Sequence, residues 1–452
     1  MIRLQFDHAL LPGGWAENVG VDVEDGTIAA VVPNAAPAGR ERVAGIAIPG
    51  LPNLHCHAFQ RGMAGLTEQR GPTGDSFWSW RQLMYHFLRE ITPDDAEVLA
   101  EQAYMEMLEG GFTAVGEFHY LHHAPDGQPY ANLAEMAERI AAAANATGIG
   151  LTLLPCLYGY GSIGGGSATE GQRRFLNDPE RFLRLVEDAR NAIRALPDAA
   201  LGIAPHSLRA VTPETLRAVI AAMPEGPIHI HAAEQVKEVE DCVAWSGQRP
   251  VEWLLAHAAV DERWCLIHST HMTEAETTEL ARRGAVVGLC PLTEASLGDG
   301  IFNGVAYRAA GGCFGIGTDS NIEITAPGEL KQLEYSQRLQ HRIRNAMTLN
   351  EGESTGRVLI DAALRGGAQA MARGIGALGV GQRADIVVLD GTLPEMAAVR
   401  GDRWLDTTIF SRGRAAIRDV YVGGAKVVEG GVHRERSRIT ARFARVVARL
   451  AA

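Results

Sequence analysis

The sequence has few of the features that mark nucleic-acid-binding, membrane and secreted proteins. Its 42 basic side chains are outnumbered by 54 acidic ones, and no basic run is present. Because Lys and Arg displace counterions when a protein binds nucleic acid, neither nucleic acid nor an anionic membrane is an expected partner. No stretch approaches the roughly 20 apolar residues of a membrane span, and the first residues lack a signal-peptide pattern. We therefore expect a cytoplasmic protein.

Cysteine pairs and phosphate loops are also missing. The six cysteines lie far apart without any Cys-x-x-Cys pair, so we expect reduced thiols and no four-cysteine zinc site. The glycine-rich residues 159–166 lack the Lys-Ser/Thr of a phosphate loop, and we interpret them as a loop at the end of a strand. At 452 residues, the chain is long enough for one large domain with an appendage, or for two domains.

From about residue 46, short apolar runs rich in Val, Ile and Leu alternate with helical patterns, which is typical of β/α units and a parallel sheet. The runs lie at residues 46–55, 112–118, 149–157, 201–205, 227–231, 264–268, 285–290 and 313–319. Eight parallel strands are the number that closes a barrel. We therefore predict an α/β fold, with a TIM-like (β/α)8 barrel over residues 46–375.

The two ends of the chain have a different pattern. Residues 1–45 and 376–435 contain alternating or short β-like runs separated by turn signals. We predict that residues 1–45 and 376–452 together form a small composite β-sandwich domain, which also carries a C-terminal helix.

Two histidines stand where the first predicted strand ends. His55 and His57 are separated by one residue, so their side chains point to the same side of an extended strand. Two neutral imidazoles that converge make half of a zinc site, although such a pair taken alone is more often an ordinary surface or core pair. Active sites of barrels lie at the C-terminal ends of the strands. This position favours the metal-binding interpretation.

Other predicted strands end on matching side chains. His231 ends the fifth strand, His268 the sixth and Asp319 the eighth. Taken singly, His268 is interpretable as a core histidine and Asp319 as a turn or helix-cap residue. Together at one rim they predict a site for one divalent metal ion, Zn²⁺, held by His55, His57, His231 and Asp319, with room for a water. Iron and manganese accept the same ligand types.

A carboxylate lies near the predicted metal site. Glu234 follows His231 by three residues, close enough to exchange a proton with a water on the metal. The alternative is a solvated carboxylate at the start of a helix, where a negative charge is favourable. His229 shares a strand face with His231, but the spacing to Glu234 favours His231 as the ligand.

These residues resemble the amidohydrolase superfamily, whose members are metal-dependent hydrolases built on a distorted (β/α)8 barrel. The resemblance covers nearly the whole chain and includes PGLPNLHCH, the HxxE pattern at His231 and Glu234, Asp319, and RADIVVLD. Some members bridge two metals through a carboxylated lysine. Here the three lysines all follow the fifth predicted strand. The resemblance therefore implies a single-metal site of the deaminase type.

Further motifs are similar to those of the N-formimino-L-glutamate deiminase family of histidine degradation: HCHAFQRGMAG, SFWSWRQLMY, EFHYLHH, APHSLRAV and HIHAAEQ. This resemblance implies a homodimer and substrate contacts from Gln60, Arg81, Tyr120, His206 and Arg209. The implied substrate is a small dicarboxylate with an amidine group, and arginines hold carboxylates through paired hydrogen bonds. The alternative for the two arginines is an ordinary surface position, and the alternative for Gln60 and Tyr120 is packing within a loop.

The implied reaction is hydrolysis of the amidine to N-formyl-L-glutamate and ammonia. We expect Asp319 to take a proton from the attacking water, Glu234 to protonate the leaving nitrogen, and His268 to stabilise the tetrahedral adduct. Two alternatives stay open: a deaminase that acts on a nucleobase or a related aminated heterocycle, and a catalytically silent binding protein with the same fold.

Overall fold

Parallel strands form a barrel in the computed structural model, which describes residues 1–70 and 75–451. One arc pairs β5 (Leu51–Cys56), β6 (Phe112–His119) and β7 (Gly150–Leu157), and β7 also pairs with the short strands β8 (Ala200–Leu201) and β9 (Ala204–Pro205). The other arc pairs β10 (Ile228–Ala232), β11 (Trp264–His268), β12 (Val286–Leu289) and β13 (Cys313–Ile316). Parallel bridges, Ile203 with Ile228 and Cys56 with Asp319, join the arcs. The predicted barrel is confirmed.

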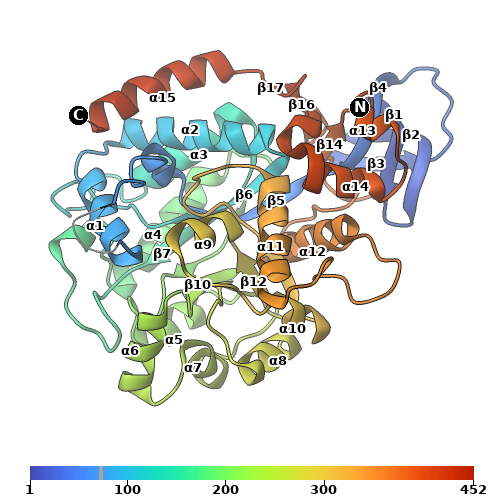
Figure 1. Ribbon diagram of the computed structural model, residues 1–452. Helices are drawn as coiled ribbons and strands as arrows, with labels where there is room; N and C mark the ends of the chain where they lie inside the picture. Colours follow the sequence, from blue (N-terminus) through green and yellow to red (C-terminus); the bar gives the residue numbers. More distant parts are fainter. Residues whose placement is uncertain (71–74, 452) are drawn as a thin grey trace.

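Helices surround these strands, as Figure 1 shows. Among the helices that follow the barrel strands are α2 (Pro93–Glu109), α3 (Glu135–Thr147), α4 (Pro179–Ile193), α5 (Pro213–Ala222), α6 (Val236–Ser246), α7 (Pro250–His257), α8 (Glu274–Arg282), α11 (Ala326–His341) and α12 (Thr355–Ala370). The remaining elements in this part are η1 (Ala58–Met63), α1 (Phe77–Leu88), η2 (Glu170–Gln172), α9 (Pro291–Leu297) and α10 (Gly304–Ala309).

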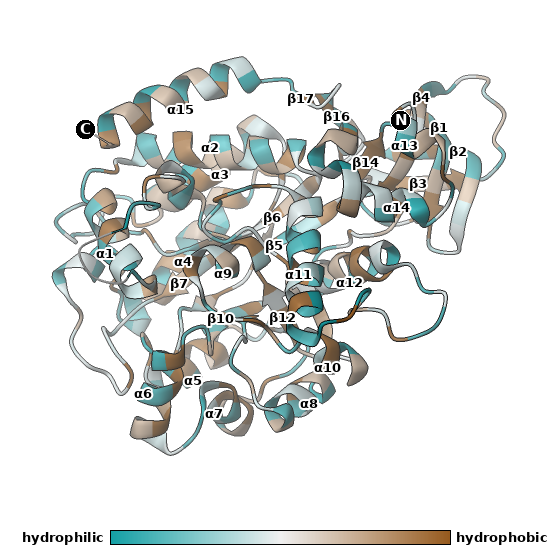
Figure 2. Cartoon of the chain, in the orientation of Figure 1, coloured by the Kyte–Doolittle hydropathy of each residue, from teal (hydrophilic) through white to brown (hydrophobic). Residues whose placement is uncertain are grey.

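The outer helices begin with N-terminal capping interactions, and each buries the side chains of one face. In α2, Thr92 Oγ1 accepts from the Asp95 backbone N–H at 3.2 Å, the Asp95 carboxylate accepts from the Thr92 N–H at 2.8 Å, and Pro93 is the first helical residue. α4 buries residues three or four apart, Phe182, Leu185, Val186, Ala189 and Ile193. The outer helices accordingly mix hydrophilic and hydrophobic residues in Figure 2. None of the helices in the described residues is long and apolar enough to cross a bilayer.

Both ends of the chain contribute to a second sheet, beside the barrel in Figure 1. Its strand order is β17–β16–β15–β14–β4–β1–β2–β3. The strands are β1 (Ile2–Leu11), β2 (Gly14–Glu24), β3 (Thr27–Val32), β4 (Glu41–Pro49), β14 (Ile386–Leu389), β15 (Ile417–Val422), β16 (Ala425–Glu429) and β17 (Val432–His433). Between β14 and β15 lie α13 (Pro394–Ala397), α14 (Arg403–Thr407), η3 (Thr408–Arg412) and η4 (Gly413–Ala416). Side chains from both halves of the sheet share one apolar core, so the predicted joining of the chain ends is confirmed.

The first predicted strand, residues 46–55, is divided between the two sheets. β4 runs to Pro49 and pairs with β1 and β14, whereas β5 begins the barrel at Leu51. Between them, the Gly50 N–H donates to the Asp385 carbonyl at 2.9 Å. We therefore propose a domain boundary after Pro49 rather than after residue 45. The predicted boundary after residue 375 stays a prediction, and residues 71–74 and 452 of the predicted domains lie outside the described residues.

The C-terminal helix α15 (Arg436–Leu450) packs against the barrel helix α2 rather than against the sheet of the chain ends. Arg442 Nη1 donates to Glu101 Oε2 at 2.7 Å, and Arg449 Nη2 lies 2.5 Å from Asp95 Oδ2. Glu101 is buried, so its pairing is shielded from water. The C-terminal helix thus packs against the outer surface of the barrel and is held there by ion pairs.

The division at Gly50 leads to a stability prediction. A Cβ atom at Gly50 would lie 2.2 Å from Thr113 Cγ2, so Gly50→Ala forces the two sheets apart and should lower the free energy of unfolding by about 1–3 kcal/mol. Denaturant unfolding measures this change. Gly13→Ala is the matched control, because no atom lies within 4 Å of a Cβ there. An equal loss of unfolding free energy in both variants would contradict the close approach of Gly50 to Thr113.

Candidate active site

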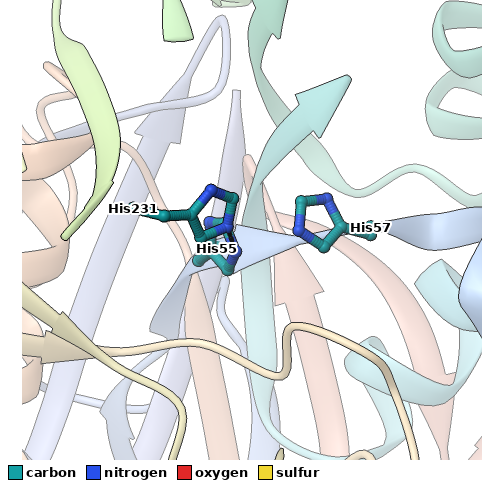
Figure 3. Close-up of side chains that lie close together, drawn as sticks. All are labelled: His55, His57 and His231. Atoms are coloured by element: carbon teal, nitrogen blue, oxygen red, sulfur yellow. Dashed lines mark hydrogen bonds between the residues drawn. The ribbon is translucent and has the colours of Figure 1, made fainter. Parts of the chain in front are cut away.

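The four predicted metal ligands meet at the C-terminal rim of the barrel. His55 Nε2 lies 3.2 Å from His231 Nε2 and 3.4 Å from Asp319 Oδ1, and His57 Nε2 lies 3.3 Å from the same oxygen. One ring nitrogen from each of the three histidines lies within 4.8 Å of the others, and Figure 3 shows the three rings facing one another. All four side chains are buried.

Backbone contacts between β5 and the end of β13 bring Asp319 to the histidines. The Asp319 N–H donates to the His55 carbonyl at 3.0 Å, and the His57 N–H donates to the Asp319 carbonyl at 3.0 Å. A Cβ atom at Gly317 would lie 2.6 Å from the His55 carbonyl oxygen. Only glycine allows this approach. The GTD sequence at residues 317–319 is therefore needed to place the carboxylate.

Hydrogen bonds behind the rings orient two of the histidines. His57 Nδ1 lies 2.9 Å from the Phe118 carbonyl, and His231 Nδ1 lies 2.9 Å from the His206 carbonyl. A carbonyl only accepts, so each Nδ1 carries the hydrogen and each Nε2 presents a lone pair to the centre. Buried histidine ligands are usually fixed in this way by outer partners.

The electrostatics of the cluster fit a divalent cation. Burial lowers the pKa of His55 to about 3 and also lowers the pKa of His57 and His231, so the rings are neutral. Burial alone would raise the pKa of Asp319, but its hydrogen bond to His55 and the nearby histidines hold it below its usual range. His55 Nε2 lies 3.2 Å from His231 Nε2 and 3.4 Å from Asp319 Oδ1, so nitrogen and oxygen donors converge on one point. The donor set therefore suits a metal such as Zn²⁺.

Glu234 is a buried, paired carboxylate rather than a solvated residue at a helix start. Its Oε2 accepts from Arg209 Nη2 at 3.0 Å, and its Oε1 lies 3.8 Å from His268 Nε2. The backbone N–H groups of Ala233 and Glu234 donate to the Glu238 carboxylate at 3.0 and 3.1 Å. Glu238 therefore fixes the turn that aims Glu234 at the pocket.

His268 lies among three carboxylates. Its Nε2 faces Glu234 and lies 3.9 Å from Asp319 Oδ2, while its Nδ1 lies 3.2 Å from Glu294 Oε1. Burial alone would lower the pKa of His268, but the charges of Glu234, Glu294 and Asp319 raise it to about 10. The structure thus places His268 in the site and not in an apolar core.

A pocket opens onto these residues. Four of the five predicted substrate contacts line it: Gln60, Arg81, Tyr120 and His206. Gln60 Nε2 donates to the Tyr120 hydroxyl at 2.8 Å, which holds both polar groups in place. The fifth, Arg209, lies beside the pocket through its contact with Glu234.

The two predicted arginines lie near the same aromatic ring. The Arg81 guanidinium is 5.9 Å from the centroid of Phe77 and 4.6 Å from that of Trp78, and the Arg209 guanidinium is 5.6 Å from the centroid of Phe77. Arginine stacks favourably on aromatic faces while its N–H groups stay available for ligands. Two guanidinium groups thus lie near Phe77, and one of them, that of Arg209, is paired with the Glu234 carboxylate.

Several residues of the site were not predicted from the sequence. Glu238 and Glu294 orient Glu234 and His268 through hydrogen bonds. Neither glutamate lies at a characteristic distance from a sequence motif, so nothing in the sequence indicated that it belongs to the site. The pocket also has an aromatic lining, whose members are Phe77, Trp80, Tyr85, Tyr158 and Phe175. The SFWSWRQLMY segment contains three of them, and its aromatic content was a signal for a pocket wall.

Comparison with known proteins assigns the fold to a family. The amidohydrolase family model matches residues 46–427. The chain belongs to the amidohydrolase family. A model described as the N-terminal domain of formimidoylglutamate deiminase HutF matches residues 7–45. A formimidoylglutamate deiminase from Pseudomonas aeruginosa is 50% identical over 446 residues, which are 98% of each chain. A 5-methylthioadenosine/S-adenosylhomocysteine deaminase from Halobacterium salinarum is 31% identical and covers 84% of this chain and 82% of its own.

Solved structures agree with this assignment. An amidohydrolase from Brucella melitensis has a TM-score of 0.96 and 54% identity, and each chain is covered to 100%. An adenosine deaminase from Xanthomonas campestris with bound zinc has a TM-score of 0.82 and 23% identity, with 100% of this chain and 98% of that chain covered. The second likeness concerns the fold alone. Because amidohydrolases are metal-dependent hydrolases, the predicted enzyme class is confirmed.

The geometry leads to a prediction on metal binding. His231→Gln should lose most of the bound metal, because it removes one of three converging ring nitrogens. The metal content of the purified protein, measured by inductively coupled plasma mass spectrometry, checks this. His229→Gln is the matched control two residues away on β10, since His229 Nε2 bonds the Ala370 carbonyl at 2.8 Å instead. Unchanged metal in His231→Gln, or equal losses in both variants, would show that His231 is not a ligand.

Proposed function

We propose that the chain hydrolyses N-formimino-L-glutamate to N-formyl-L-glutamate and ammonia. The observation that carries the proposal is one pocket that combines metal-type ligands and carboxylates with Arg81, and that has Arg209 beside it in contact with Glu234. The substrate offers matching groups, an amidine and two carboxylates. The 50% identity to the deiminase from Pseudomonas aeruginosa over nearly the whole chain supports the same activity.

His55, His57, His231 and Asp319 would hold one divalent ion, for which we propose Zn²⁺. Such an ion acts as a Lewis acid and makes water a nucleophile near neutral pH. The lone pairs on the Nε2 atoms support this assignment, because Zn²⁺ binds neutral imidazole and carboxylate together. The remaining residues of the site are proposed to transfer protons and to orient the substrate.

Proton transfer is proposed to involve three side chains at the rim. Asp319, whose Oδ1 lies 3.4 Å from His55 Nε2 and 3.3 Å from His57 Nε2, accepts a proton from the attacking water. Glu234 carries a proton to the departing nitrogen, so that the amidine carbon keeps the new oxygen and ammonia leaves. His268 Nε2, which faces both carboxylates, hydrogen-bonds the tetrahedral adduct. General acid–base groups of this kind contribute about 10²- to 10⁴-fold each.

Arg81 and Arg209 are proposed to bind the two substrate carboxylates, with Gln60, Tyr120 and His206 completing the contacts. The position of both guanidinium groups near Phe77 supports this role, because it gathers two positive charges at one side of the pocket. The same proposal includes a role in histidine degradation, a cytoplasmic location and a homodimer, which rest on the resemblance to the deiminase family.

A second candidate function has one observation in its favour. Six aromatic side chains, Tyr120 included, line the pocket, which would suit a planar heterocycle such as a nucleobase. The relative from Halobacterium salinarum acts, by its name, on adenosine derivatives. Two arginines near the pocket have no partner on an uncharged base, and this favours the dicarboxylate.

Ammonia release distinguishes these substrates. The purified protein should release ammonia from N-formimino-L-glutamate, with N-formyl-L-glutamate identified by mass, and should leave guanine, adenosine and cytosine unchanged. N-formiminoglycine keeps the amidine but lacks the second carboxylate, so its kcat/KM should be lower by about tenfold or more. Turnover of a nucleobase at a higher kcat/KM would replace the proposal, and absence of all turnover by metal-loaded protein would favour a silent binding protein.

The proposed role of Glu234 gives a separate prediction. Glu234→Gln should lower kcat by about 10²- to 10⁴-fold, because an amide cannot carry the proton to the leaving nitrogen. Bound metal should stay at the wild-type level. Glu240→Gln, an identical change at an exposed position of the neighbouring helix α6, is the control and should keep full activity. Near-normal ammonia release by Glu234→Gln would exclude the assigned proton transfer.

A further inference from the structure

Glu294 is a buried carboxylate next to the site that the proposed reaction does not use. It lies in α9, the short helix that follows β12. Its Oε1 accepts the Cys290 backbone N–H at 2.9 Å and lies 3.2 Å from His268 Nδ1. An ionised carboxylate only accepts, so the hydrogen in this contact belongs to Nδ1 of His268.

This hydrogen bond determines which side of the His268 ring faces the pocket. With Nδ1 directed at Glu294, Nε2 is directed at Glu234 Oε1 and Asp319 Oδ2, at 3.8 and 3.9 Å. The backbone at His268 and Ser269 has φ values of 68° and 49°, which are unusual for residues other than glycine. A conformation of this kind persists only where surrounding contacts hold it. Glu294 supplies one such contact to the ring itself.

The helix that carries Glu294 is anchored on both sides. The Leu292 N–H donates to Glu329 Oε2 at 2.9 Å, and Glu329 is fully buried in α11. Thr293 Oγ1 donates to the Thr318 carbonyl at 3.1 Å and lies 3.0 Å from Ser320 Oγ. Thr318 and Ser320 flank the proposed ligand Asp319. Thr293 therefore contacts the segment after β13, and Glu294 contacts the end of β11. These bonds fix the position of α9 and so of the Glu294 side chain.

We propose that Glu294 is a positioning residue for the deimination reaction: it holds the His268 ring through Nδ1 so that Nε2 faces the reacting atoms. This inference rests on the proposed function, in which His268 hydrogen-bonds the adduct. Partners that orient a functional histidine in this way typically matter by about 10- to 100-fold when removed.

Cys290 offers a competing interpretation. His268, Cys290 and Glu294 together have ligand atoms within 4.8 Å of one another, which is a geometry that a metal ion can use. The direct contact between His268 and Glu294 at 3.2 Å favours a hydrogen bond instead. Burial also raises the pKa of the Cys290 thiol well above its usual range, which disfavours the thiolate that a metal needs.

Three variants test the proposal. Glu294→Ala should lower kcat by about 10- to 100-fold with an unchanged KM and unchanged bound metal. Glu294→Gln should recover most of the lost kcat, because its amide oxygen accepts the same two hydrogen bonds. Glu334→Ala is the matched control: Glu334 is a fully buried carboxylate in α11 that accepts the N–H groups of Ala346 and Met347 at 2.7 and 3.0 Å. It should lose stability and keep kcat.

A second measurement does not need activity. Proton–nitrogen NMR of the metal-free protein with ¹⁵N-labelled histidine should show an Nδ1–H of His268 that exchanges slowly with solvent in the wild type and in Glu294→Gln, but rapidly in Glu294→Ala. His268→Asn identifies the signals. If the wild type fails to turn over formiminoglutamate, the proposed function falls while this measurement still tests the positioning.

Three results would overturn the positioning role. One is an unchanged kcat in Glu294→Ala together with an unchanged His268 signal. Another is an equal fall of kcat in Glu294→Ala and Glu334→Ala, which would make the effect one of general stability. The third is loss of a second equivalent of metal in Glu294→Ala, which would assign these residues to a metal site.

Discussion

The site depends on the close approach of the end of β13 to β5. Gly317 has no Cβ atom and so allows the backbone to approach His55, and two residues later a parallel bridge joins Asp319 to Cys56, between the two histidines of the first barrel strand. Buried polar contacts secure the junction: Asn53 Nδ2 donates to Thr318 Oγ1 at 2.7 Å, and Asn321 Nδ2 donates to the His57 carbonyl at 3.1 Å. Because buried polar groups are costly when unpaired, this network holds the barrel closed in one register.

Barrel closure also brings basic and acidic side chains to one pocket. Neutral imidazoles and Asp319 form one group, while Arg81 and Arg209 lie near Phe77. Glu234 links the two groups, since it pairs with Arg209 and faces His268. The proposed substrate, with an amidine and two carboxylates, would find groups of both charges in this pocket. The same arrangement keeps the proposed proton carrier beside the group that leaves.

Much of this could be predicted from the sequence, because parallel strands place their C-terminal ends at one rim. The periodic apolar runs predicted the eight strands, and the residues that end them predicted the cluster of His55, His57, His231 and Asp319. The division of residues 46–55 could not be predicted. The run is apolar throughout, and only the contact of Gly50 with Thr113 and the pairing of β4 with β14 end the first strand at Pro49.

Supporting contacts were harder to predict than the ligands. Glu238 and Glu294 act on residues four and 26 positions away, through turns whose geometry no periodicity encodes. The docking of α15 on α2 joins residues more than 300 positions apart, Glu101 with Arg442. Such contacts arise from tertiary packing. A local sequence pattern therefore indicates which residues can bind a metal or transfer a proton, but it does not indicate which other residues orient those side chains.

Anomalous X-ray diffraction at the zinc edge, on crystals of the zinc-loaded protein, tests the central claim most directly. The account predicts one peak about 2.0–2.2 Å from the Nε2 atoms of His55, His57 and His231 and from a carboxylate oxygen of Asp319. A peak among His268, Cys290 and Glu294 instead, or full activity without any peak at the barrel rim, would contradict it.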